Sequence, residues 1–160
     1  MDIFSVREVI EMAVRTEVLG NSYYNDLAAK FKGGDKEIYE LFTKLAEAEK
    51  NHIVAFSALR EKVGDEEPDN WQDISEYMRA FVESAFFLGK DKAMLHMQNV
   101  SDPLHAVGLA IGFEKETLLY FYTMRDAVKE NHIVNEIIEE EKHHIVWLSK
   151  YKAERSAHHK

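Results

Sequence analysis

An eight-residue segment occurs twice in this chain, and the repetition limits the folds open to it. Residues 47–54 read EAEKNHIV and residues 139–146 read EEEKHHIV, so six of the eight positions are identical. A weaker match precedes each copy, because residues 13–24 resemble residues 110–121 in the placing of a glutamate and two aromatic residues. An internal duplication is the simplest account, and it predicts two similar halves related by a pseudo-twofold axis.

Each half has the pattern of two long helices. Ser5 and Glu8 form a capping box at the start of the first helix, and Gly33-Gly34 ends it. Two glycines leave room only for a tight turn, so we expect the first two helices to be antiparallel. Asp102-Pro103 is a typical start for the third helix. Apolar residues recur at helical spacing within four ranges, which are about 6–31, 35–63, 102–129 and 132–151.

A less regular connection separates the two halves. Residues 64–70 form a polar break, residues 71–88 have a helical pattern, and residues 89–101 are irregular. The apolar cluster of Phe81 and residues 85–88 is interpreted as the packed side of a crossover helix, with a dimer interface as the alternative. The sequence therefore predicts an all-α four-helix bundle with a long helical crossover between helices 2 and 3.

The length and composition of the chain exclude several classes of protein. The length of 160 residues suits one domain, expected to span residues 1–160, with a polar, frayed tail over residues 152–160. Twenty Lys and Arg against 29 Asp and Glu give a net charge of −9, which argues against a nucleic-acid partner. Cysteine is absent, which excludes disulfides and thiolate metal ligands. No signal peptide or membrane span is visible, so a cytoplasmic location is expected.

Six polar side chains interrupt the apolar faces of the four predicted helices. Burying four carboxylates costs several kcal/mol each unless a positive charge compensates, and no Lys or Arg shares those faces. Two divalent cations would balance the four negative charges. Glu-x-x-His places a carboxylate and an imidazole on one helical face, and this motif occurs twice. The predicted metal ligands are Glu17, Glu49, His52, Glu114, Glu141 and His144.

Each of these residues has an ordinary explanation when taken alone. A single glutamate on a helix is commonly solvated, as we expect for Glu47, Glu139 and Glu140, and a single histidine is commonly a core residue. A bundle that has kept the ligands without a functional metal is a further alternative. Tyr24 lies on the same face as Glu17 and is the best candidate for a residue that supports a ligand.

These motifs resemble the rubrerythrin family of ferritin-like di-iron proteins, over most of the chain from Ser5 to Tyr151. The resemblance implies a ferritin-like bundle holding two iron ions, in a site that manganese or zinc could also occupy. Glu49 and Glu141 would bridge the ions and act as the catalytic pair. Glu17 with His52 would serve one ion, and Glu114 with His144 the other. The shared marks are Glu17-x-x-Gly20 with Tyr24, Glu49-x-x-His52, Glu114 with Tyr122, and Glu141-x-x-His144.

Two departures from the family pattern bear on function. Full-length rubrerythrins carry a four-cysteine iron site, whereas this chain has no cysteine, so electrons would come from an external donor protein. Thr117 stands where rubrerythrins have an additional glutamate associated with peroxidase activity. The resemblance implies an oxidoreductase that reduces peroxide or dioxygen, expected to be a homodimer. The alternative is a ferroxidase or iron-handling protein without catalytic turnover.

Overall fold

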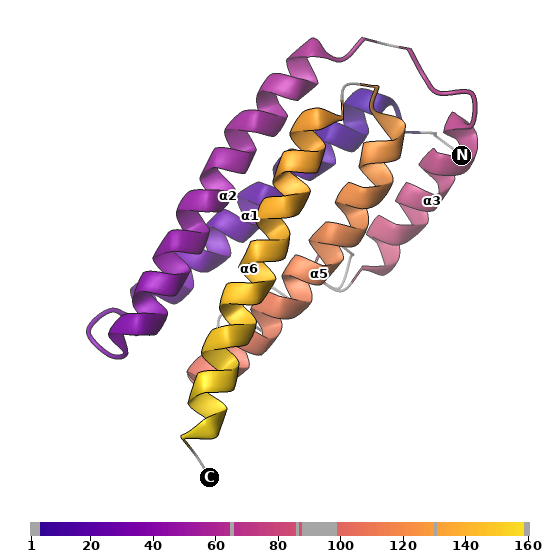
Figure 1. Cartoon of the computed structure of the whole chain (residues 1–160). Coiled ribbons are helices and arrows are strands. Elements are labelled where there is room, and N and C mark those ends of the chain that lie inside the picture. The colour runs from indigo at the N-terminus through magenta and orange to yellow at the C-terminus, as the bar shows by residue number, and fades with distance from the viewer. Residues whose placement is uncertain (1–3, 65, 86, 88–98, 130, 159–160) are drawn as a thin grey trace.

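The computed structural model describes residues 4–64, 66–85, 87, 99–129 and 131–158. In the described residues, four long helices form a bundle, and a shorter helix, α3, runs along its outside beside α5 (Figure 1). Within the described residues there is no β-strand. The all-α bundle predicted from the sequence is therefore confirmed. The helices are α1 (Val6–Phe31), α2 (Lys36–Lys62), α3 (Trp71–Ser84), α5 (Pro103–Ala127) and α6 (His132–Ala157).

Local side-chain chemistry sets where the helices begin. The predicted capping box at the start of α1 is present, with Ser5 and Glu8 each bonded to the backbone amide of the other. Asp35 caps α2 by accepting from two backbone amides, and Asp102 caps α5 in the same way through one. Gly33 adopts a φ of 87°, a left-handed conformation that glycine tolerates and that closes the turn between α1 and α2.

The bundle consists of two hairpins that pack against each other. α1 packs most extensively on α2 and α5 on α6, while α1 against α5 and α2 against α6 join the hairpins. The apolar core divides into two clusters along the bundle. One contains Tyr24, Phe42 and Phe113, and the other contains Phe56 and Phe121. In every long helix the predicted ligands fall between the residues of these two clusters, so apolar layers close off the polar centre at both ends.

The helix in the crossover ends earlier than the predicted range of residues 71–88. Helix α3 ends at Ser84, because Ala85 is extended and Phe87 turns inward onto α5. The Phe87 ring packs edge-on against Phe113 at 5.5 Å and lies beside Gly112. Phe87 is therefore buried within its own chain. Residues 86 and 88 of the predicted apolar cluster, and residues 89–98 of the irregular connection, lie outside the described residues.

The C-terminal segment predicted to be frayed is helical up to Ala157. Tertiary contacts hold it against the start of α2. Arg155 forms ion pairs with Asp35 at 2.7 Å and with Glu37 at 3.0 Å, and the Tyr151 hydroxyl donates to Asp35 at 2.9 Å. The polar sequence of this segment gave no indication of these partners.

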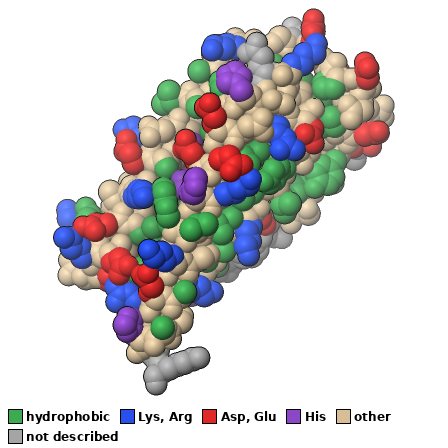
Figure 2. Space-filling model, in the orientation of Figure 1, with side chains coloured by type: hydrophobic (Ala, Val, Ile, Leu, Met, Phe, Trp, Pro, Cys, Tyr) green, Lys and Arg blue, Asp and Glu red, His purple; other side chains and the backbone are tan. Residues whose placement is uncertain are grey.

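The surface is charged and mixed in sign. Figure 2 shows acidic and basic side chains interspersed over the face in view. Within the described residues, none of the helices is both long enough and apolar enough to cross a membrane.

Candidate metal centre

Six polar side chains meet in the middle of the bundle. All six are buried, and each of the four long helices contributes at least one of them. Their inward direction follows from the helical period, because each continues the apolar face of its own helix. The four carboxylates are fully buried, with an exposure of 0%. The residues that the structure brings together are Glu17 on α1, Glu49 and His52 on α2, Glu114 on α5, and Glu141 and His144 on α6.

The six residues divide into two overlapping groups of four. In each group one oxygen or nitrogen atom per residue lies within 4.8 Å of the others, the spacing expected of ligands around one ion. Glu49 and Glu141 belong to both groups. The family resemblance implied bridging positions for these two glutamates, and they are the residues that the two groups share. Glu17 and His52 complete the first group, and Glu114 and His144 complete the second.

The two histidines face the shared carboxylates through the same ring nitrogen. The His52 Nδ1 atom lies 2.9 Å from Glu141 Oε1 and 3.6 Å from Glu17 Oε2. The His144 Nδ1 atom lies 3.3 Å from Glu141 Oε2 and 3.5 Å from Glu114 Oε1. The two imidazole rings are stacked, with centroids 5.6 Å apart. The two halves of the centre are thus arranged alike, as the duplicated sequence predicts.

The centre is short of hydrogen-bond donors. Seven carboxylate oxygens and both histidine Nδ1 atoms are buried without a hydrogen-bond partner. Among the described residues, no Lys or Arg lies within ion-pair distance of the four carboxylates. Buried polar atoms in proteins are nearly always satisfied, so such a cluster calls for a missing partner. Oxygen and nitrogen donors with a formal charge of −4 fit two divalent cations.

The lack of hydrogen-bond donors and of compensating positive charge also shifts the pKa values of the residues in the centre. Burial raises the pKa of Glu17 and of Glu49 well above the usual value, and neighbouring carboxylates add to this effect. Burial and the charge of Glu141 raise the pKa of Glu114 to about 8. Burial alone would lower the pKa of His52, but contact with Glu141 outweighs it and raises the value to about 9. Without metal, protons therefore take the place of cations.

The pKa of Glu141 shifts in the opposite direction from that of the other three carboxyl groups. Burial and the charge of Glu49 work to raise its pKa, but the close approach of Glu114, His144 and His52 outweighs them and lowers it. Glu141 is therefore the group that carries negative charge most readily in the metal-free centre. Its position between the two histidines accounts for this difference.

Two residues of α1 support the ligands. The Tyr24 hydroxyl donates a hydrogen bond to Glu114 Oε1, which confirms the supporting role expected for it. At Gly20 an added Cβ would lie 2.9 Å from Phe113 Cε1 and 3.3 Å from Glu49 Cδ. Glycine at this position lets the ligand helices approach closely.

The structure places Glu140 differently from the sequence expectation. Although its side chain is 57% exposed, Glu140 Oε2 lies 2.8 Å from His52 Nε2. It is therefore in contact with a candidate ligand and is not a purely solvated residue. Sequence reasoning missed this contact because it depends on α2 and α6 lying side by side. The other two expected surface glutamates, Glu47 and Glu139, are exposed as predicted.

Two further residues named from the sequence lie apart from the six. Tyr122 is half-buried, with Arg125 and Lys142 near its ring, and it belongs to neither ligand group. Thr117, one turn beyond Glu114, is buried, and its hydroxyl has no hydrogen-bond partner. The structure therefore places a small neutral side chain at the position where the resemblance noted from the sequence implied an additional glutamate.

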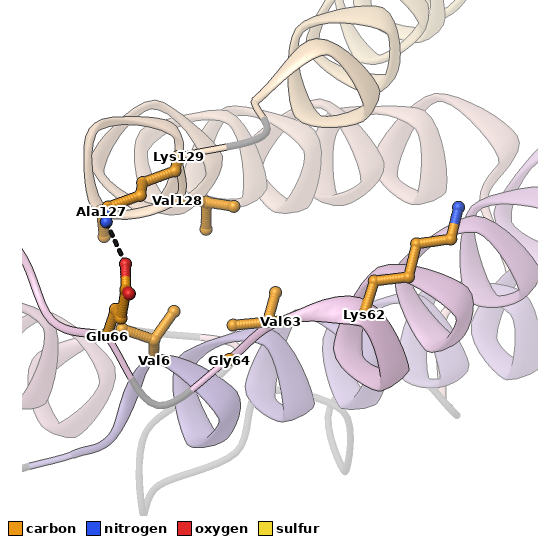
Figure 3. A pocket seen from close by; sticks show the side chains of 8 residues that line it. All are labelled: Val6, Lys62, Val63, Gly64, Glu66, Ala127, Val128 and Lys129. Carbon is orange, nitrogen blue, oxygen red and sulfur yellow. Dashed lines mark hydrogen bonds and ion pairs between the residues drawn. The ribbon is translucent and has the colours of Figure 1, made fainter.

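A separate pocket at the end of the bundle contains none of the six residues. Figure 3 shows it between the start of α1 and the ends of α2 and α5. Lys129 and Glu66 form an ion pair across it, and Lys62 lies at its edge. The carboxylate in its lining, Glu66, is paired with Lys129, and the lining offers no set of metal ligands.

Comparison with known proteins agrees with the geometry. The family model for rubrerythrin matches residues 8–152, which include all six candidate ligands. The chain belongs to the rubrerythrin family. A solved structure from Thermotoga maritima, described as a ferritin-like diiron-carboxylate protein, matches with a TM-score of 0.70 and 24% identity. The match covers 97% of this chain and 99% of that one, and it shows that the two chains share a fold. Among curated proteins, the search found no match.

Proposed function

We propose that this protein is a di-iron carboxylate oxidoreductase that reduces hydrogen peroxide or dioxygen. The observation that carries the proposal is the set of buried, unpartnered carboxylate and imidazole atoms at the centre of the bundle. Donor sets of oxygen and nitrogen without sulfur suit iron and manganese. Two bound iron ions would supply two electrons by passing from the ferrous to the ferric state.

The residues around the centre have distinct roles in this proposal. Glu49 and Glu141 would hold both ions, because each belongs to both ligand groups. His52 and His144 fix the geometry of one ion each through Nδ1. The apolar layers on either side exclude bulk water and competing reactions. Tyr24 orients Glu114 by its hydrogen bond.

A pocket on the side of the bundle is the entrance that we propose for a small oxidant. It has a volume of about 310 Å³ and lies between α1, α3 and α5. Thr16, the neighbour of Glu17 in the chain, lines it together with Tyr120 and Phe87. The buried, unpartnered hydroxyl of Thr117 lies on α5 between Glu114 and Tyr120 and is available to hydrogen-bond a bound oxidant.

The electrons that restore the ferrous state would come from outside the chain. The sequence has no cysteine with which to hold an iron–sulfur or rubredoxin-like relay. We therefore assign this role to a separate electron-donor protein, and we expect the protein itself to be a homodimer.

The test begins with metal-free protein loaded anaerobically with ferrous iron. We expect about two iron ions per chain, located by anomalous scattering at the iron edge. On mixing with hydrogen peroxide or dioxygen, the bound iron should oxidise faster than free ferrous ion in the same buffer. The Glu49→Gln/Glu141→Gln variant serves as the control that lacks both shared carboxylates. Oxidation no faster than that of free iron would contradict the proposal.

Catalytic turnover and the mass of the assembly distinguish the proposed oxidoreductase from the iron-handling alternative. An oxidoreductase consumes many equivalents of oxidant when a reduced donor is supplied, whereas a ferroxidase without turnover stops when its iron is oxidised. Light scattering should give the mass of a dimer. A closed shell of many subunits, as ferritin-type storage requires, would favour the alternative.

A further inference from the structure

The two halves of the centre have matching ligands but different neighbours. In the repeated segment, Glu140 stands directly before the ligand Glu141, whereas Ala48 stands directly before the equivalent ligand Glu49. This is one of only two positions at which the two copies differ. The difference bears on the centre because Glu140 is in contact with His52.

On the first side, a carboxylate supports the histidine. Glu140 Oε2 lies 2.8 Å from His52 Nε2. An ionised carboxylate can only accept a hydrogen bond, so the proton of a neutral imidazole resides on Nε2. The lone pair is then on Nδ1, the atom that faces Glu17 and Glu141. Glu140 thus fixes the His52 ring in the tautomer that binds metal.

On the second side, no such support is present. Ala48 has no polar side-chain atom, and among the described residues no carboxylate lies within ion-pair distance of His144 Nε2. The His144 ring instead lies beside the Trp147 indole, with centroids 5.4 Å apart. The Lys44 Nζ atom sits 3.4 Å from the centre of that indole. The outer edge of His52 thus meets a carboxylate, whereas the His144 ring lies beside an indole that carries a lysine on its face.

We propose that Glu140 is a positioning residue that makes the two metal positions unequal. This inference rests on the di-iron centre proposed above. The ion held by Glu17 and His52 binds more tightly than the ion held by Glu114 and His144, because a carboxylate bonded to a ligating histidine fixes its orientation and raises its basicity. Removing such a carboxylate typically weakens metal binding by about 10-fold to 100-fold.

The test is a titration of the metal-free full chain with Co²⁺, followed by calorimetry and by the visible absorption of the bound ion. The wild type should bind two ions in two steps whose dissociation constants differ by about 10-fold or more. The Glu140→Ala variant, which has alanine at both equivalent positions, should weaken the tighter step and bring the two constants together. Circular dichroism checks that the fold is retained.

A matched control and a mirror variant complete the design. Glu139→Ala removes the adjacent exposed glutamate, which pairs with Lys142 and contacts no ligand, and should leave both steps unchanged. Ala48→Glu supplies the missing carboxylate on the second side and should tighten the weaker step. Equal steps in the wild type, or a Glu140→Ala titration identical to wild type, would overturn the inference. Failure to bind Co²⁺ at all would overturn the proposed di-iron function as well.

Discussion

The Tyr24 hydroxyl donates a hydrogen bond to Glu114 Oε1, which links the first helical hairpin to a candidate ligand on the second. Burial raises the pKa of this hydroxyl well above its usual value, so it remains a donor throughout the working range of pH. The other oxygen of Glu114, Oε2, has no hydrogen-bond partner and is left for a metal ion. The tyrosine thus holds one oxygen and leaves the other available.

Replacing Tyr24 by Phe should weaken metal binding and lower stability. The change removes a buried hydrogen bond to a carboxylate, which contributes about 1.5–3 kcal/mol to the free energy of unfolding. Tyr120→Phe is the matched control, because its hydroxyl donates to the Val9 carbonyl at 2.6 Å away from the ligands. Both variants should be less stable in denaturant titrations, and only Tyr24→Phe should lose metal affinity. Equal metal binding by the two variants would contradict the role of Tyr24.

The Glu49→Gln/Glu141→Gln variant should lose both metal ions and gain stability in the metal-free state. It removes two acidic groups that repel each other when both are ionised, so the metal-free centre no longer has to take up a proton to relieve that repulsion. The side-chain volumes are kept, and we expect a gain of about 1 kcal/mol or more. Urea unfolding of the metal-free proteins measures the gain, and metal analysis measures the loss of binding. Glu47→Gln/Glu139→Gln changes exposed residues at equivalent positions and should alter neither quantity. A metal-free double variant less stable than wild type would count against charge repulsion in the centre.

The metal-free protein should lose stability as the pH rises from about 4.5 to about 9. The pKa of Glu114 is raised from 4.5 to about 8, so its protonated form stabilises the fold below 4.5 and that contribution is lost as pH rises to 8. The pKa of His52 is raised from 6.5 to about 9, so the contribution of its charged form is lost over that interval. The pKa of Glu141 is lowered, so protonation of this residue affects stability only at more acidic pH.

Metal loading should change this pH dependence. Metal ions bind the deprotonated ligands, so metal affinity rises with pH. The stability of the metal-free protein falls over the same range. Thermal unfolding of the metal-free and loaded proteins across the same pH range measures the difference. Glu114→Gln should reduce the slope of the metal-free protein. A metal-free protein that becomes more stable toward pH 9 would show that the cluster does not hold protons in place of cations.

Gly20→Ala should destabilise the bundle and disturb metal binding. The added methyl group would lie 2.9 Å from the buried Phe113 ring and 3.3 Å from Glu49 Cδ. Overpacking of this kind costs about 1–3 kcal/mol. Gly108→Ala, also within a helix but with no heavy atom within 4 Å of the new Cβ, is the matched control and should gain about 0.5–1 kcal/mol. Thermal unfolding compares them, and equal effects would contradict the close approach at Gly20.

Much of the fold and of the candidate site followed from local patterns. The starts of the helices follow from capping residues such as Ser5 and Asp102, whose partners are only three residues away. The convergence of the six polar residues follows from helical periodicity, because a carboxylate that continues an apolar face must point inward with it. Duplication of Glu-x-x-His then indicated that the two inward faces belong to one centre.

Other features depend on neighbours that are distant in the sequence. The end of α3 depends on Phe87 packing against Phe113, and the helical C-terminus depends on Arg155 reaching Asp35. Polar residues on the outer side of a helix look alike in sequence, so nothing distinguishes Arg155 from a solvated residue. These contacts exist only once the helices are assembled.

The sequence by itself determined the class of fold, the four long helices and the six residues that face inward, because helical spacing and capping are properties of short stretches of chain. Only the tertiary structure decided that Glu140 supports His52 while His144 lies beside Trp147. The physical reason is that the electrostatic surroundings of a histidine depend on the side chains of the adjacent helix. Which of those side chains lies opposite is set by how the two hairpins pack together.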